Sequence, residues 1–187
     1  GVALLLARLA VGVLGARRLI GGATRIRGRW THAQCVSPVT VGLAAPRVIL
    51  PSGWWKWPVA ELGAILAHEN EHVRRRDPLI ALVVLVNRAL FWFHPLAWWL
   101  SRRVSTLAEE ACDTAVIARG YDPATYCRSL VRFARPTANA RPPLALGTPM
   151  PGSALGARLR LLERGPAPAP SPRKVAITAA GYVLAVA

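Results

Sequence analysis

The stretch LAHENEHVRRRD, residues 66–77, contains two of the four histidines in this chain of 187 residues. His68 and His72 are four positions apart, and this spacing places both imidazoles on one face of an α-helix, where they can reach one ion. Glu69 follows the first histidine, so its carboxylate can accept a proton from a water molecule that a divalent cation has made acidic. The spacing predicts a zinc site with hydrolytic chemistry. The alternative is an ordinary charged helix without a metal.

A third ligand has to come from elsewhere, because catalytic zinc sites usually have three protein ligands. The remaining histidines, His32 and His94, are candidates. A carboxylate further along the chain is the other possibility. The spacing of the acidic residues after residue 107 favours the carboxylate.

The segment LAEEACD, residues 107–113, contains acidic residues at helical spacing. Glu109 and Asp113 share one helical face, so Glu109 could bind the metal while Asp113 accepts a hydrogen bond from a ligating imidazole. Glu110 points about 100° away from that face and is the weaker candidate. We therefore predict Glu109 as the third ligand and Asp113 as the residue that orients a histidine.

The apolar run at residues 79–100, LIALVVLVNRALFWFHPLAWWL, is long enough to be mistaken for a membrane span. A spanning helix would separate the histidines from Glu109 by a bilayer, and Asn87 and Arg88 would be costly in lipid. Pro95 disfavours helical geometry at the residue before it and suits the first turn of a new helix. We therefore predict a hairpin that returns Glu109 to the histidines, with helices over about 80–93 and from about 95.

Short strands are expected before the histidine motif. In residues 30–51, β-branched residues alternate with small or polar ones and prolines interrupt the pattern. The overall class is therefore mainly α with a small β element (α+β).

An extended substrate can add itself to an exposed edge strand, and flanking prolines suit an edge. A purely structural edge strand is the alternative. The candidate edge residues are Val39, Thr40, Val41, Gly42 and Leu43.

The composition is both basic and apolar. The chain has 24 Lys and Arg against 9 Asp and Glu, a net charge of +15, and 53% hydrophobic residues. Such a charge can attract nucleic acid or an anionic membrane, or can flank membrane helices. Because the arginines flank apolar segments and no aromatic-and-basic sheet motif occurs, we expect no direct nucleic-acid binding. Three cysteines without CxxC spacing indicate neither a disulfide framework nor a thiolate zinc site, which fits a reducing compartment.

Both ends of the chain are apolar, and basic residues adjoin each end on its inner side. We interpret residues 1–20 as a partial transmembrane helix with a basic flank of arginines, and residues 175–187 as the start of a further one. The positive-inside rule then makes the intervening chain cytoplasmic. It is expected to hold a metallopeptidase domain over 21–135 and a Pro/Ala-rich segment with a short helix over 136–174. Two core helices of a soluble protein are the alternative reading of the ends.

Several motifs in a fixed order carry a family resemblance, closely over about residues 36–120. They are SPVTVGL, RVILP, HENEH with RRRDPL, FWFHPLAWW and EEACD. In this order they resemble the membrane-bound antirepressor metallopeptidases of the BlaR/MecR type, which are signal transducers of β-lactam resistance. The resemblance implies a gluzincin-like zinc metallopeptidase domain between transmembrane helices, in the bacterial cytoplasmic (inner) membrane, multi-pass, with its active site facing the cytoplasm.

The same resemblance implies roles for individual residues and partners. His68, His72 and Glu109 would bind Zn²⁺, and Glu69 would be the catalytic acid and base. The expected substrate is a cytoplasmic protein, a DNA-binding transcriptional repressor, and the lipid bilayer is the expected environment.

Several points stay open at this level. A catalytically inactive zinc-binding membrane regulator would keep the ligands and lose turnover. No penicillin-binding sensor sequence accompanies the motifs within the 187 residues, so the resemblance carries over no β-lactam sensing. The donor to an oxyanion could be any of Tyr121, Tyr126, His94 and the arginines.

Overall fold

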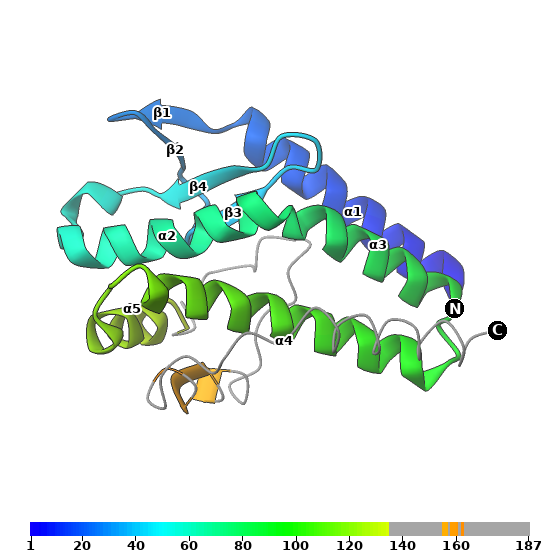
Figure 1. The fold of residues 1–187 in the computed structure, drawn as a ribbon. Helices are drawn as coiled ribbons and strands as arrows, with labels where there is room; N and C mark the ends of the chain where they lie inside the picture. The colour runs from blue at the N-terminus through cyan, green and yellow to red at the C-terminus, as the bar shows by residue number, and fades with distance from the viewer. Residues whose placement is uncertain (135–154, 157, 161, 163–187) are drawn as a thin grey trace.

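The computed structural model describes residues 1–134, 155–156, 158–160 and 162. The fold is mainly helical with one small sheet (Figure 1), in agreement with the α+β class predicted from the sequence. The helices are α1 (Val2–Gly21), η1 (Trp54–Lys56, a 3-10 turn), α2 (Val59–Arg75), α3 (Asp77–Leu90), α4 (Pro95–Ala118) and α5 (Pro123–Ala134).

The sheet has four short strands in the order β1-β2-β4-β3. Its strands are β1 (Thr24–Ile26), β2 (Arg29–His32), β3 (Val39–Val41) and β4 (Arg47–Pro51). β2 pairs with β4 in parallel, whereas β1–β2 and β3–β4 are antiparallel. The strands expected within residues 30–51 are confirmed, and β3 lies at an edge of the sheet as predicted. The prediction was wrong for Gly42 and Leu43, which follow the end of β3. Gly42 has φ +106°, a left-handed conformation that no longer continues the strand.

The arginines after residue 20 form a β-hairpin, where the sequence suggested only a basic flank beside a membrane. Arg27 and Gly28 join β1 to β2 with φ values of 50° and 81°. Two consecutive residues with positive φ make the two-residue turn whose twist matches a hairpin. The guanidinium carbons of Arg25 and Arg47 lie 5.5 and 5.1 Å from the ring centroid of Trp30. These arginines therefore cover an aromatic side chain of the sheet.

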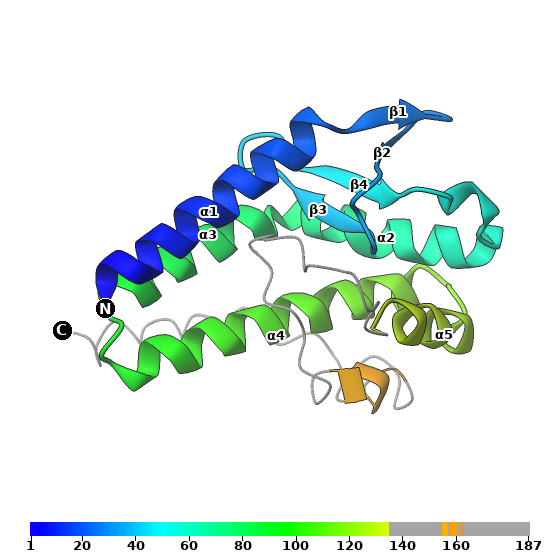
Figure 2. The ribbon, with the colours of Figure 1, turned by 180° about the vertical axis from the view of Figure 1, so that it is seen from behind.

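Residues 1–20, interpreted as a partial transmembrane helix, lie in α1, which runs along α3 (Figures 1 and 2). In the part of the chain that the structure describes, no helix combines the length and apolarity needed to cross a membrane. Residues 175–187, the other expected membrane segment, lie outside the described residues.

α2 is the central element, with the sheet on one side and α4 on the other (Figures 1 and 2). It ends at Arg75, and Arg76, with a φ of 57°, separates it from α3. The predicted reversal is confirmed: α3 ends at Leu90, and α4 begins at Pro95 and returns alongside α3. His94 caps α4, because its Nδ1 accepts the N–H of Leu96 at 3.2 Å.

A buried cluster joins α2, α4 and α5 beside the histidine motif. Ala64 and Ala67 of α2 pack there with Val116 of α4 and Tyr126 of α5. Leu162, from a short helical stretch late in the chain, completes the cluster. This packing fixes the separation of α2 and α4, the two helices that carry the candidate ligands.

Candidate metal centre

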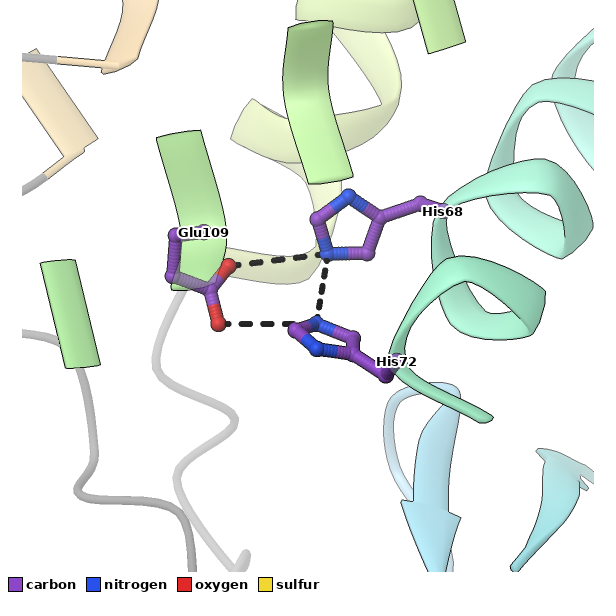
Figure 3. A group of neighbouring side chains, drawn as sticks. All are labelled: His68, His72 and Glu109. Carbon is purple, nitrogen blue, oxygen red and sulfur yellow. Dashed lines mark hydrogen bonds and ion pairs between the residues drawn. The ribbon is translucent and has the colours of Figure 1, made fainter. Parts of the chain in front are cut away.

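Three side chains from two helices converge at the α2–α4 interface (Figure 3). His68 and His72 project from α2, and their Nε2 atoms are 3.1 Å apart. Glu109 projects from α4, with Oε2 3.5 Å from His68 Nε2 and Oε1 3.7 Å from His72 Nε2. The helical hairpin therefore brings together the three residues that the sequence suggested as ligands. The Glu109 side chain is 26% exposed, so the centre is open on one side.

The donor set fits a zinc ion. Zinc bonds to histidine nitrogen and carboxylate oxygen are about 2.0–2.2 Å long, so tetrahedral donors lie about 3.3–3.6 Å apart. The three separations of 3.1, 3.5 and 3.7 Å are close to this range. The hydrogen bonds that His68 and His72 make through Nδ1 also direct both Nε2 atoms into the centre.

His68 is held from behind by Tyr126 and Asp113. The Tyr126 hydroxyl donates to Asp113 Oδ1 at 2.7 Å and accepts from His68 Nδ1 at 2.7 Å. Asp113 is fully buried, and its direct separation from His68 Nδ1 is longer, at 3.3 Å. The predicted link between Asp113 and a candidate ligand therefore runs mainly through the phenol. Burial, and then the charge of Asp113, raises the pKa of Tyr126, so its hydroxyl stays protonated and can donate.

The protonation of His68 reflects the surrounding carboxylates. Burial lowers the pKa of His68, but Asp113 and Glu109 outweigh this effect and raise it to about 9. The metal-free centre therefore holds a proton at neutral pH, and an incoming metal ion has to displace it.

His72 is oriented by Asp77, a residue that the sequence interpretation passed over. Its Nδ1–H donates to Asp77 Oδ2 at 2.7 Å, which directs Nε2 towards the other candidate ligands. The left-handed turn at Arg76 brings the first residue of α3 back to the histidine. Cys112 Sγ lies 3.4 Å from His72 Nδ1. Burial raises the pKa of this thiol, so in the metal-free protein it is a neutral neighbour of His72.

Glu69 connects α2 to the edge strand. The Thr40 hydroxyl lies 2.7 Å from Glu69 Oε2 and 3.1 Å from the Glu69 carbonyl oxygen. Since a hydroxyl has one hydrogen to donate, the shorter contact to the carboxylate is the stronger bond. The candidate base and the candidate substrate strand are thus joined by a direct hydrogen bond.

Other residues that the sequence raised lie outside this group. Among the residues that the structure describes, His32 and His94 do not join the cluster. His32 accepts the N–H of Gln34 on the sheet, and His94 caps α4. Glu110 is likewise absent from the group, as its place on the helix predicted.

Arg158 was not singled out from the sequence. Its Nη1 lies 2.9 Å from Glu109 Oε2, and its Nε and Nη2 donate to the two oxygens of Asp113. A signal was present, because Arg158 and Leu162 are four residues apart in the predicted short helix, and both are buried.

Comparisons with known proteins agree with the family resemblance seen in the sequence. Residues 30–162 match the family model described as BlaR1 peptidase M56, a range that includes Arg158 and Leu162. The chain is also 37% identical over 81 residues to the regulatory protein BlaR1 of Bacillus licheniformis. That alignment covers 43% of this chain and 14% of the relative, so only a small part of the relative is represented.

Proposed function

We propose that this chain, which belongs to the BlaR1 peptidase M56 family, is the peptidase portion of a regulatory membrane protein and hydrolyses peptide bonds with one zinc ion. The convergence of His68, His72 and Glu109 at zinc-like separations carries this proposal. Two ligands on one helix and a carboxylate from a later helix make a gluzincin-like arrangement. Glu69, between the two histidines on α2, supplies the remaining group that hydrolysis requires.

The residues of the chain divide the chemistry between them. Zinc, when bound, would supply a Lewis acid that lowers the pKa of water and polarises the scissile carbonyl. Glu69 accepts the proton of the attacking water and then delivers it to the leaving amine. The Thr40 hydroxyl orients the Glu69 carboxylate. Tyr126 and Asp77 hold the two imidazoles with Nε2 directed to the centre.

The edge strand offers a way to present an extended substrate. β3 pairs with β4 along one side only among the described strands, so its other side can pair with a peptide. The bond between Thr40 and Glu69 joins this strand to the candidate base, which supports a role for the strand in presenting the substrate. A peptide added there would be extended and would run past the proposed zinc site. A flexible segment of a folded substrate protein could adopt this conformation.

The proposed biological substrate is a cytoplasmic protein, a DNA-binding transcriptional repressor, cleaved at the inner face of the bacterial membrane as one step of a signalling pathway. The family supports this, since the B. licheniformis relative is named a regulatory protein. A catalytically inactive zinc-binding regulator is the competing function. Peptide-bond cleavage distinguishes a peptidase from such a regulator.

New protein N-termini in cells test the proposal. Cells that produce the wild-type chain are compared with cells that produce Glu69→Gln, which retains size and hydrogen bonding but cannot accept a proton. Cleavage should fall by about two to four orders of magnitude, the usual effect of losing a general base. Zinc content should not change. Glu110→Gln, on α4 outside the cluster, is the matched control and should cleave like the wild type.

Identical N-termini in the wild-type and Glu69→Gln samples, with zinc retained in both, would reject the peptidase and favour the inactive regulator. The N-termini that disappear in Glu69→Gln alone would identify the substrate.

A further inference from the structure

A buried cation lies directly behind the candidate ligands. Arg158 is only 7% exposed, although it belongs to a short helical stretch beyond α5. Its Nε donates to Asp113 Oδ2 at 2.6 Å, and its Nη2 donates to Asp113 Oδ1 at 2.5 Å. Its third nitrogen, Nη1, lies 2.9 Å from Glu109 Oε2. One guanidinium group thus holds two carboxylates that are four residues apart on α4.

The position of Arg158 does not depend on these ion pairs alone. Leu162, one helical turn further along, is 5% exposed and packs against Tyr126 and Val116 in the cluster that joins α2, α4 and α5. Residues four apart share a helical face. The apolar contact of Leu162 therefore holds this stretch in place beside the ion pairs of Arg158. It fixes the backbone position from which the guanidinium extends to Glu109.

The contact with Glu109 has a consequence for how that carboxylate can bind a metal. Oε2 is engaged by Arg158 at 2.9 Å and lies 3.5 Å from His68 Nε2, whereas Oε1 lies 3.7 Å from His72 Nε2. A carboxylate anchored through one oxygen cannot rotate freely about its terminal bond. A guanidinium has the planar fork needed to hold Asp113 with two nitrogens and Glu109 with the third, whereas an ammonium is a point charge without that geometry.

We propose that Arg158 is a positioning residue for the metal centre: it fixes Glu109 as a ligand through a single oxygen and thereby raises the zinc affinity of the site. The inference rests on the proposed zinc function. It assigns the short helical stretch around residue 158 to the centre, as the part of the chain that completes it.

Two effects of Arg158 on zinc oppose each other, and their balance is measurable. Its positive charge repels a divalent cation, so a purely electrostatic role predicts tighter zinc binding when the charge is removed. Its hydrogen bonds orient a ligand, and the loss of such outer partners typically lowers metal affinity by about 10- to 100-fold. The three contacts with the two carboxylates, at 2.5–2.9 Å, favour the second effect.

The test is zinc affinity of the full chain in detergent, measured by competition with a chromogenic chelator. Arg158→Gln and Arg158→Lys should both bind zinc about 10- to 100-fold more weakly than the wild type. The lysine variant keeps the charge and loses the fork, so its loss isolates geometry from charge. Arg160→Gln is the matched control, since Arg160 lies in the same short helix and is exposed; it should bind like the wild type.

Two further readouts separate positioning from a general structural role. X-ray absorption of the zinc-loaded wild type should show a carboxylate bound through one oxygen, and two-oxygen binding would overturn the proposal without any variant. Thermal unfolding of the metal-free proteins tests whether Arg158→Lys merely destabilises the fold. A lowered melting temperature with unchanged zinc affinity would also overturn it.

The outcomes for zinc distinguish this inference from the proposed function. Unchanged or tighter zinc binding in Arg158→Lys and Arg158→Gln, with zinc bound by the wild type, would overturn the role of Arg158 and leave the peptidase standing. A wild type that binds no zinc would reject both.

Discussion

The hydroxyl of Tyr126 determines which nitrogen of His68 faces the metal centre. It accepts from His68 Nδ1–H and donates to Asp113, so in the neutral imidazole of His68 the lone pair lies on Nε2. Without the hydroxyl, only the 3.3 Å contact with Asp113 would favour this tautomer. Asp113 keeps its two bonds to Arg158 in either case. The phenol is therefore a specific orienting group for one candidate ligand.

Tyr126→Phe removes that hydroxyl and keeps the ring. We expect zinc affinity to fall by about 10-fold, at the lower end of the range for outer partners, because the direct contact with Asp113 survives. The free energy of unfolding should fall by about 1–3 kcal/mol for the two buried hydrogen bonds that are lost. Chelator competition and denaturant unfolding measure the two quantities. Tyr121→Phe is the control, and equal zinc affinity in Tyr126→Phe and wild type would contradict the orienting role.

The candidate metal ligands were predictable from the sequence, whereas most of the residues behind them were not. Helical spacing alone indicated His68, His72, Glu109 and Asp113, because each pair shares a face one turn apart. Asp77, Tyr126 and Arg158 reach the cluster through a left-handed turn, a separate helix and a distant stretch of chain. No local spacing encodes such tertiary contacts.

At the scale of elements, the contact between α2 and β3 would link catalysis to substrate position in the proposed peptidase. It depends on Thr40, the middle residue of the edge strand, whose hydroxyl donates to Glu69. A peptide that extends the sheet beyond β3 would shift with the strand. The carboxylate of Glu69 is held to the same strand and should keep its place relative to the peptide.

Thr40→Val tests this link, since valine has nearly the same shape and no hydroxyl. Zinc content should remain at the wild-type level, because the hydrogen bonds of the Thr40 hydroxyl described above go to Glu69 and not to a candidate ligand. Cleavage should fall by about 10-fold as Glu69 loses its fixed orientation, a loss of about 1.4 kcal/mol of transition-state stabilisation. Peptide cleavage rates measure this. Thr24→Val, on the opposite edge strand, should cleave normally, and unchanged cleavage in Thr40→Val would break the link.

Sequence patterns predicted some of the secondary-structure elements and missed others. Pro95 predicted the reversal between α3 and α4, because proline restricts the residue before it and suits a first helical turn. The β1–β2 hairpin was missed, because Arg27 has positive φ and only Gly28 carries the usual turn signal. The run of arginines there suggested a membrane flank instead.

At the scale of the whole molecule, the proposed zinc ion would tie together the two helices that frame the core. α2 contributes two ligands and α4 one, and both helices also meet in the apolar cluster around Val116. A ligand that binds only the folded state stabilises it according to its concentration relative to its dissociation constant. Metal removal should therefore loosen the whole assembly of helices and not only the active site.

Chelation of the purified chain should lower its melting temperature. Zinc at 100 times its dissociation constant would stabilise the fold by about 2.7 kcal/mol, which corresponds to roughly 5–10 °C for a domain of this size. Differential scanning fluorimetry with and without EDTA measures the shift. Glu109→Gln should show little response to EDTA, and an equal response in this variant would mean that the stabilising metal binds elsewhere.

The zinc content of purified chains tests the central claim most directly. The wild type should contain about one zinc ion per chain by elemental analysis. His68→Ala and Glu109→Gln should each lose most of it, because the remaining two ligands cannot hold the ion. Glu110→Gln, next to Glu109 but outside the cluster, should keep it. Full zinc content in both His68→Ala and Glu109→Gln would contradict the metal centre formed by α2 and α4.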